Sequence, residues 1–179
     1  DYTKHHESNK LLELGAFNIN SGKTDQAINN YLKCIKEYPL CIEAYNNLAI
    51  LLNERLEKNS AIKVMKKAIL IGPNNHKLYR TLGIFTFENG LEIKSIKCFN
   101  KAIEIEPAFD DAYFNLGNVL YGMARLGKIK YSKAVEAYQE AIHINPNFFN
   151  AYKNLGDLYL HFRQSLLASA NYRKAIYLQ

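Results

Sequence analysis

Apolar and small side chains recur along the chain at intervals of three and four residues. In one pattern a larger apolar residue stands three positions before a leucine, as at Tyr45 and Leu48, and glycine or alanine follows the leucine. In a second pattern a small residue, a bulky one and another small one follow each other, as at Ala134, Tyr138 and Ala141. Residues three and four apart share one face of a helix. The sequence therefore predicts alternating first and second helices, each with one apolar stripe.

Both patterns occur five times in the 179 residues. The leucines of the first helices are Leu14, Leu48, Leu82, Leu116 and Leu155. The second helices carry an opening small residue (Ala27, Ala61, Ser95, Ala134, Ala168), a bulky residue (Tyr31, Met65, Phe99, Tyr138, Tyr172) and a closing small residue (Cys34, Ala68, Ala102, Ala141, Ala175). Small residues allow two helix backbones to approach closely, and we expect the bulky residues to fill the space beside them.

The prolines recur at the same position of successive repeats. Pro39, Pro73 and Pro107 are 34 residues apart, and Pro146 follows after 39. Proline cannot continue a helix and pushes the residue before it out of the helical region, so each proline is expected to end a unit. A fixed period near 34 residues predicts a stack of helical hairpins. The units are Ser8–Cys41, Ile42–Asn75, His76–Phe109, Asp110–Phe148 and Phe149–Gln179, preceded by a leader at residues 1–7.

This arrangement resembles the tetratricopeptide repeat (TPR) family, although Tyr or Leu stands at the family's usual tryptophan position. The resemblance covers residues 8–179 as a single array. It implies an all-α, right-handed superhelix (an α-solenoid) of five helix-turn-helix repeats. It also implies that first helices line a concave groove, that second helices form the outer face, and that the protein binds other proteins without catalysis.

The fourth repeat has five extra residues between its helices, around Met123–Ser132. Either the loop is longer or both helices extend. The insertion is either a surface feature or a contact for a partner.

Charge, cysteine content and missing motifs exclude several classes of function. The net charge is +6, with many lysines in the second helices, where a solubilising outer face is expected rather than a nucleic-acid site. We found no stretch apolar enough for a membrane span or a signal peptide. The three cysteines lack metal-ligand spacing, and Cys34 and Cys98 are interpreted as reduced packing residues, which indicates an intracellular protein, cytoplasmic or nuclear. Catalytic, phosphate-binding and metal motifs are lacking, so we expect no enzyme activity, no cofactor and no metal.

The helical period places a set of side chains on the groove face of the first helices. These candidate binding residues are Asn47, Lys77, Arg80, Phe87, Phe114, Asn115, Asn118, Tyr121 and Asn154. Asparagine precedes the leucine in three repeats, and a row of such amides could pair with a peptide backbone. The alternative is that these amides tie one helix to the next or face water.

The segments around Asn47, Asn115 and Asn154 are similar to repeats of the TPR arm of O-linked N-acetylglucosamine transferases, where an asparagine ladder holds peptides. The first hypothesis is therefore a protein-binding scaffold that takes a peptide in its groove. The second is the substrate-recognition arm of a larger enzyme such as an O-linked glycosyltransferase. A third is a scaffold that binds through outer-face lysines, among them Lys63, Lys66 and Lys97. We also expect end-to-end self-association through the fifth repeat, which ends without a capping helix.

Overall fold

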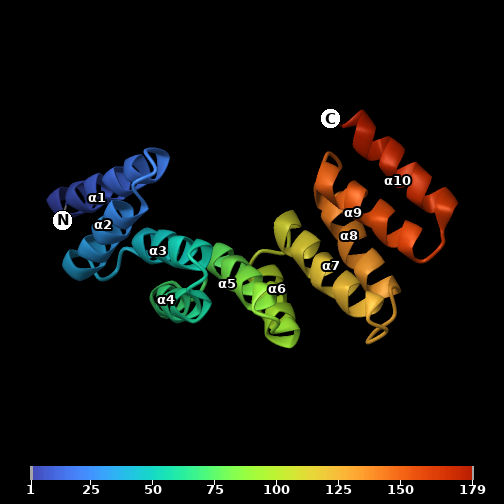
Figure 1. The fold of residues 1–179 in the computed structure, drawn as a ribbon, viewed down its shortest axis with the longest axis horizontal. Helices are drawn as coiled ribbons and strands as arrows, with labels where there is room; N and C mark the ends of the chain where they lie inside the picture. The colour runs from blue at the N-terminus through green and yellow to red at the C-terminus, as the bar shows by residue number, and fades with distance from the viewer. Residues whose placement is uncertain (1, 179) are drawn as a thin grey trace. The chain divides into compact units, whose positions relative to one another are not determined.

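The computed structural model describes residues 2–178, with side chains from His6 onward, and these residues form ten helices and no strand (Figure 1). The predicted all-α fold is confirmed. In chain order the helices are α1 (Tyr2–Asn20), α2 (Thr24–Glu37), α3 (Ile42–Glu54), α4 (Lys58–Ile71), α5 (His76–Glu88), α6 (Glu92–Ile105), α7 (Asp110–Arg125), α8 (Ser132–Ile144), α9 (Phe149–His161) and α10 (Ser165–Tyr177).

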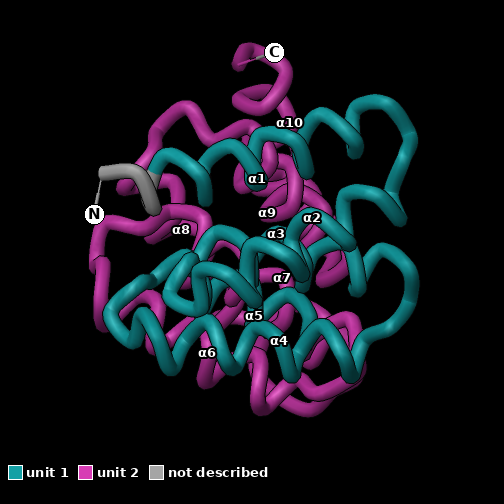
Figure 2. Tube along the Cα trace, turned by 90° about the vertical axis from the view of Figure 1, so that its left-hand side faces the viewer, with its two compact units in different colours: residues 1–85 teal, residues 86–179 magenta. Residues whose placement is uncertain are grey.

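Two compact units divide the chain, residues 1–85 and 86–179, and the boundary falls inside α5 (Figure 2). In the first unit α1 packs on α2, α2 on α3, and α3 on α4. In the second unit each of α6 to α9 packs on the helix that follows it. Contact between successive elements is the packing mode of repeat proteins, in which each unit is stabilised by its neighbours.

The predicted stripes of the second helices form the core of each unit. Ala27, Tyr31 and Cys34 of α2 are at most 1% exposed, and Ala134, Tyr138 and Ala141 of α8 are fully buried. In α10 the small residues Ala168 and Ala175 are buried but Tyr172 is only half-buried. The stripe of the first helix is likewise incomplete in the first repeat, where Leu14 is 46% exposed.

The glycine after the leucine has a packing role that the spacing alone does not show. A Cβ atom on Gly117 of α7 would lie 2.7 Å from Cδ1 of Tyr138, and one on Gly156 would lie 2.7 Å from Cε1 of Tyr172. The aromatic ring of the second helix therefore rests directly on the backbone of the first. Ala49 replaces this glycine in the second repeat, where the equivalent of the ring is the flexible side chain of Met65.

Each first helix ends in the same left-handed turn. The residue at positive φ is Gly22, Leu56, Gly90, Gly127 or Arg163. In the first of these turns the Gly22 N–H donates to the Ile19 carbonyl at 2.9 Å, and the Lys23 N–H donates to the Asn18 carbonyl at 2.7 Å. The other four turns repeat both bonds. This is the Schellman arrangement, which satisfies the last carbonyls of a helix.

The second helices end where the prolines predict. The residue before each proline (Tyr38, Gly72, Glu106 or Asn145) leaves the helical region, with ψ between 70° and 91°. Its N–H still bonds the carbonyl four residues back, at 2.7 to 2.9 Å. The prolines thus fix where α2, α4, α6 and α8 end.

The insertion in the fourth repeat is divided between a helix and a loop. Helix α7 has 16 residues, whereas α3, α5 and α9 have 13, and residues 126–131 form a loop longer than the other connections. Lys128 lies 3.6 Å from Glu92 of α6, and Tyr131 stacks on Phe162 with ring centroids 4.5 Å apart. The loop therefore contacts both the preceding and the following repeat.

The two ends of the array depart from a simple repeat. Residues 2–7, expected as a leader outside the first repeat, are helical and continue into α1, while Asp1 lies outside the described residues. Several apolar side chains of α10 are exposed, among them Leu166 at 89% and Ile176 at 70%. Self-association through these side chains stays a prediction.

Candidate functional site

The candidate residues fall in both units. Asn47, Lys77 and Arg80 belong to the first unit, and the second contains Phe87, Phe114, Asn115, Asn118, Tyr121 and Asn154. Lys77 and Phe87 are exposed, and the remaining candidates are half-buried. Those that the structure brings into direct contact lie on α7 and α9 of the second unit.

Asn118 is the centre of this cluster. Its Oδ1 accepts a hydrogen bond from the Tyr138 hydroxyl at 2.8 Å and another from Nδ2 of Asn154 at 2.8 Å. Both bonds are made by the oxygen, so the orientation of the amide is fixed. Among the described residues no partner takes the Asn118 N–H groups, which are strong donors.

Aromatic side chains flank the amides. The Phe114 ring lies 6.1 Å from the Tyr138 ring and 4.9 Å from the Phe148 ring, centroid to centroid. The Tyr121 hydroxyl donates to the Asp157 carbonyl at 3.3 Å, and its ring meets the edge of His161. Burial raises the pKa of Tyr121, so its hydroxyl stays a neutral donor. The cluster therefore combines fixed hydrogen-bonding groups with apolar surface.

Asp157 also belongs to this cluster, although it is not one of the nine candidate binding residues. It follows the Leu-Gly pair in α9 as Asn118 does in α7, and its Oδ1 accepts a bond from the Tyr172 hydroxyl at 2.7 Å. Burial, followed by this bond to a carboxylate, raises the pKa of Tyr172 to about 12. The repeat position that Asp157 shares with the predicted residue Asn118 was the signal for including it.

The three asparagines before the leucines do not behave alike. Asn154 donates to Asn118 of α7. Burial raises the pKa values of Tyr138 and Tyr31 in the preceding repeats, and the amides of Asn154 and Asn47 respectively oppose that rise. Asn47 also accepts a bond from Asn46 at 3.4 Å.

In the third repeat the second helix offers Phe99, which has no hydroxyl, and the amide of Asn115 donates instead to the Asp111 carbonyl of its own helix at 2.6 Å. Only Asn154 has a hydrogen bond of the kind expected in the alternative, in which these amides tie one helix to the next, because it bonds Asn118 of α7.

The chemistry available at this cluster is that of binding. The groups present are amides, hydroxyls, aromatic rings and the Asp157 carboxylate. Among the residues that the structure describes, no group of three or more His, Cys, Asp or Glu could hold a metal ion. Cys34, Cys41 and Cys98 form no disulfide. Burial and the nearby Cys41 raise the pKa of the Cys34 thiol to about 12, so that thiol stays protonated.

Family models match three stretches of the chain. A model described as tetratricopeptide repeat matches residues 11–40, and one described as TPR repeat matches residues 94–123 and 130–161. Together they cover about half of the chain and fall in both units. Neither describes a catalytic domain.

Solved structures agree with this fold. A MamA crystal structure is 28% identical, with a TM-score of 0.76 over 92% of this chain and 94% of that one. PilF of Pseudomonas aeruginosa is 20% identical, with a TM-score of 0.85 over 99% of this chain and 78% of that one. YrrB, titled a TPR protein with an unusual peptide-binding site, is 20% identical, with a TM-score of 0.69 over 100% and 92%. The likeness to PilF and YrrB concerns the fold alone.

Among curated proteins, the rat mitochondrial import receptor subunit TOM70 is 28% identical over 101 residues, which are 56% of this chain. The aligned part spans only 17% of that receptor's length. These comparisons give no support to a specific resemblance to the O-linked N-acetylglucosamine transferase arm. In the described part of the chain, every helix is too short or too polar to cross a membrane. The chain belongs to the tetratricopeptide repeat family and is a helical-repeat scaffold of the protein-binding kind.

Proposed function

We propose that the chain binds an extended segment of a partner protein along α7 and α9. The observation that carries the proposal is the fixed amide of Asn118. Its oxygen is occupied by Tyr138 and Asn154, and its N–H groups are available to the carbonyls of a bound backbone. A donor that is already oriented loses little conformational entropy when the partner binds.

The neighbouring side chains suit the same role. Phe114 and Tyr121 are half-buried aromatic residues on the same helix as Asn118, one turn before it and one turn after it. Aromatic anchors beside hydrogen-bonding groups are common at protein-binding surfaces. Asn115 is a poorer candidate than expected, because its amide donates to its own helix.

The relatives favour a protein or peptide as the ligand. TOM70 is named an import receptor subunit, and YrrB is titled as having a peptide-binding site. Asn47, Lys77, Arg80 and Phe87 remain predicted contacts.

The experiment compares two asparagines of the same helix. Peptides selected on the wild-type chain from a random display library are titrated by calorimetry against Asn118→Asp and Asn115→Ala. Aspartate keeps the acceptor for Tyr138 and Asn154 but removes the N–H donors, and Asp157 shows that the fold accepts this residue at the equivalent position. We expect Asn118→Asp to weaken binding about three- to tenfold, the range for one or two lost hydrogen bonds.

Asn115→Ala is the matched control and should change affinity by less than about twofold, because its amide is satisfied within its own helix. Circular dichroism confirms that both variants are folded. Equal affinity of the wild type and Asn118→Asp, or failure to select any peptide, would contradict the proposal.

A further inference from the structure

The solvent-facing side of α4 carries a strongly basic surface. The exposed residues of this helix recur with helical spacing and form one stripe, namely Asn59, Ser60, Lys63, Lys66, Lys67 and Leu70. The helix contains four lysines and neither aspartate nor glutamate, and Leu70 near its end is 83% exposed. We call Lys63, Lys66, Lys67 and Leu70 the α4 patch.

The lysines of the α4 patch have no acidic partner. None of the three forms an ion pair within the described part of the chain. Glu57, the residue before the helix, lies 4.0 Å from Arg55 instead. In α6, by contrast, Lys101 stands at the repeat position of Lys67 and lies 2.7 Å from Glu104. The charge of the α4 patch is therefore not neutralised by the protein.

The helix itself gains nothing from this charge. Lysines three and four residues apart on a helix repel each other, as Lys63 does with Lys66 and Lys67. A cation stabilises a helix when it lies in the last turn, where it opposes the dipole, but the last turn of α4 contains no basic residue. A carboxylate supplied by a partner would relieve the repulsion.

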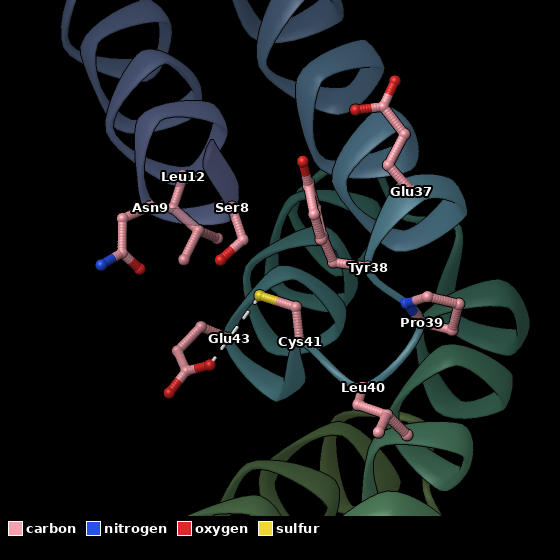
Figure 3. Close-up of a pocket in the computed structure, with 9 residues that line it drawn as sticks. All are labelled: Ser8, Asn9, Leu12, Glu37, Tyr38, Pro39, Leu40, Cys41 and Glu43. Carbon is pink, nitrogen blue, oxygen red and sulfur yellow. Dashed lines mark hydrogen bonds between the residues drawn. The ribbon is translucent and has the colours of Figure 1, made fainter. Parts of the chain in front are cut away.

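The α4 patch is a local feature and not an even spread of the net charge of +6. In the same unit, a cavity of about 580 Å³ between α1 and the turn that joins α2 to α3 is lined by Glu37 and Glu43 (Figure 3). Its lining contains no Lys, Arg or His. In α8 the repeat positions of Lys63 and Lys67 hold Glu136 and Glu140. Other parts of the chain are thus acidic where α4 is basic.

We propose that the α4 patch binds an acidic segment of a partner protein, with its carboxylates on the three lysines and an apolar side chain over Leu70. Charge complementarity of this kind speeds association and selects against basic or neutral partners. The lysine stems can add apolar contact beside Leu70. The proposal does not depend on the surface of α7 and α9.

Two other anionic partners fit the α4 patch less well. Single-stranded nucleic acids are held by aromatic side chains on which bases stack, and α4 contains no aromatic residue. A helix that lies on a membrane inserts a broad apolar face. The apolar residues of α4 other than Leu70 are buried or half-buried, so they are not available to lipid.

The first test reverses the charge of the α4 patch. A fluorescein-labelled peptide that alternates glutamate with leucine is titrated by fluorescence anisotropy in about 0.15 M sodium chloride. Lys63→Glu with Lys67→Glu should weaken binding about tenfold, because two attractions become repulsions. Glu136 and Glu140 show that the repeat accepts glutamate at these positions. Lys63→Arg with Lys67→Arg keeps the charge and should retain affinity within about twofold.

A matched control and two other anionic probes complete this test. Lys94→Glu with Lys97→Glu makes the same change of net charge at exposed positions of α6 and should weaken binding less than about twofold, because salt screens distant charges. Phosphatidylserine vesicles and a DNA oligonucleotide are titrated against the same variants. Equal weakening by both glutamate pairs, or no binding of the acidic peptide, overturns the proposal. So does an α4 variant that loses vesicle or DNA binding while it keeps peptide binding.

Chemical coupling locates the peptide independently. A water-soluble carbodiimide joins a carboxylate to a lysine amine that it contacts, and mass spectrometry identifies the lysine. We expect the acidic peptide to be joined mainly to Lys63, Lys66 or Lys67. Asn118→Asp should leave both the coupling and the affinity unchanged, which separates the α4 patch from the proposed surface on α7 and α9. Coupling mainly at Lys77, a predicted groove residue, would overturn the assignment.

Discussion

Single residues decide how closely the helices of a repeat approach. Gly117 and Gly122 both lie in α7, yet their surroundings differ. A Cβ on Gly117 would lie 2.7 Å from the buried ring of Tyr138, whereas a Cβ on Gly122 would meet nothing within 4 Å. Tyr138 is fully buried and bonded through its hydroxyl, so its ring has no room to move away. The same substitution should therefore have opposite effects five residues apart.

We predict that Gly117→Ala lowers the free energy of unfolding by about 1–3 kcal/mol, the usual cost of overpacking a core. Gly122→Ala should raise it by about 0.5–1 kcal/mol, because alanine loses less backbone entropy in a helix. Urea denaturation followed by circular dichroism measures both. If Gly117→Ala proved neutral, the close contact of ring and backbone would not be a determinant of packing.

At the scale of an element, the turn after each first helix has the same backbone conformation in all five repeats, but the residue type at its positive-φ position varies. Three of these turns place glycine at the positive-φ position, while Leu56 (φ 64°) and Arg163 (φ 60°) occupy it in the other two. A residue with a Cβ pays about 1–2 kcal/mol in the left-handed region. The turn forms nevertheless, because its two backbone hydrogen bonds and the packing of both helices impose it.

Leu56→Gly should therefore stabilise the protein by about 0.5–1 kcal/mol, the relief of strain less the larger chain entropy of glycine. Leu56 is 78% exposed, so little packing is lost. Gly22→Ala, the reverse change at the equivalent turn, should destabilise by a similar amount. Melting temperatures of the two variants should move in opposite directions, and a shift of both in the same direction would contradict this explanation.

At the scale of the molecule, each unit contains tyrosine hydroxyls whose ionisation the fold opposes. The pKa values of Tyr31 and Tyr38 in the first unit, and of Tyr138 and Tyr172 in the second, are all raised above 10.0. Burial is the main cause for Tyr31, Tyr138 and Tyr172, and the bond to Glu7 is the main cause for Tyr38.

A tyrosine with a raised folded-state pKa loses its proton more readily in the unfolded state. Its contribution to stability is thus fully present below pH 10 and is lost as the pH rises through the folded-state pKa. We predict that the free energy of unfolding, measured in urea, declines steadily above pH 10. Tyr138→Phe should show a shallower decline above that pH. A stability that stays constant well above pH 10 would show that these hydroxyls do not oppose unfolding.

The sequence by itself determined the repeat: its phase, the helix-turn-helix units, the buried stripes and the proline ends. These features follow from the period of the chain, since residues three and four apart share a helix face and each helix packs on the next. Ala27, Tyr31 and Cys34 could therefore be placed in the core without coordinates.

Only the tertiary structure decided which polar groups meet, because hydrogen bonds depend on side chains from different repeats. Asn115 and Asn154 hold equivalent positions, yet Asn115 bonds the Asp111 carbonyl of its own helix, whereas Asn154 bonds Asn118 of α7. The cavity between α1 and the α2–α3 turn has the same origin, because residues from distant parts of the sequence line it. A periodic pattern specifies how a repeat folds, and the residues that break the pattern determine what its surface can bind.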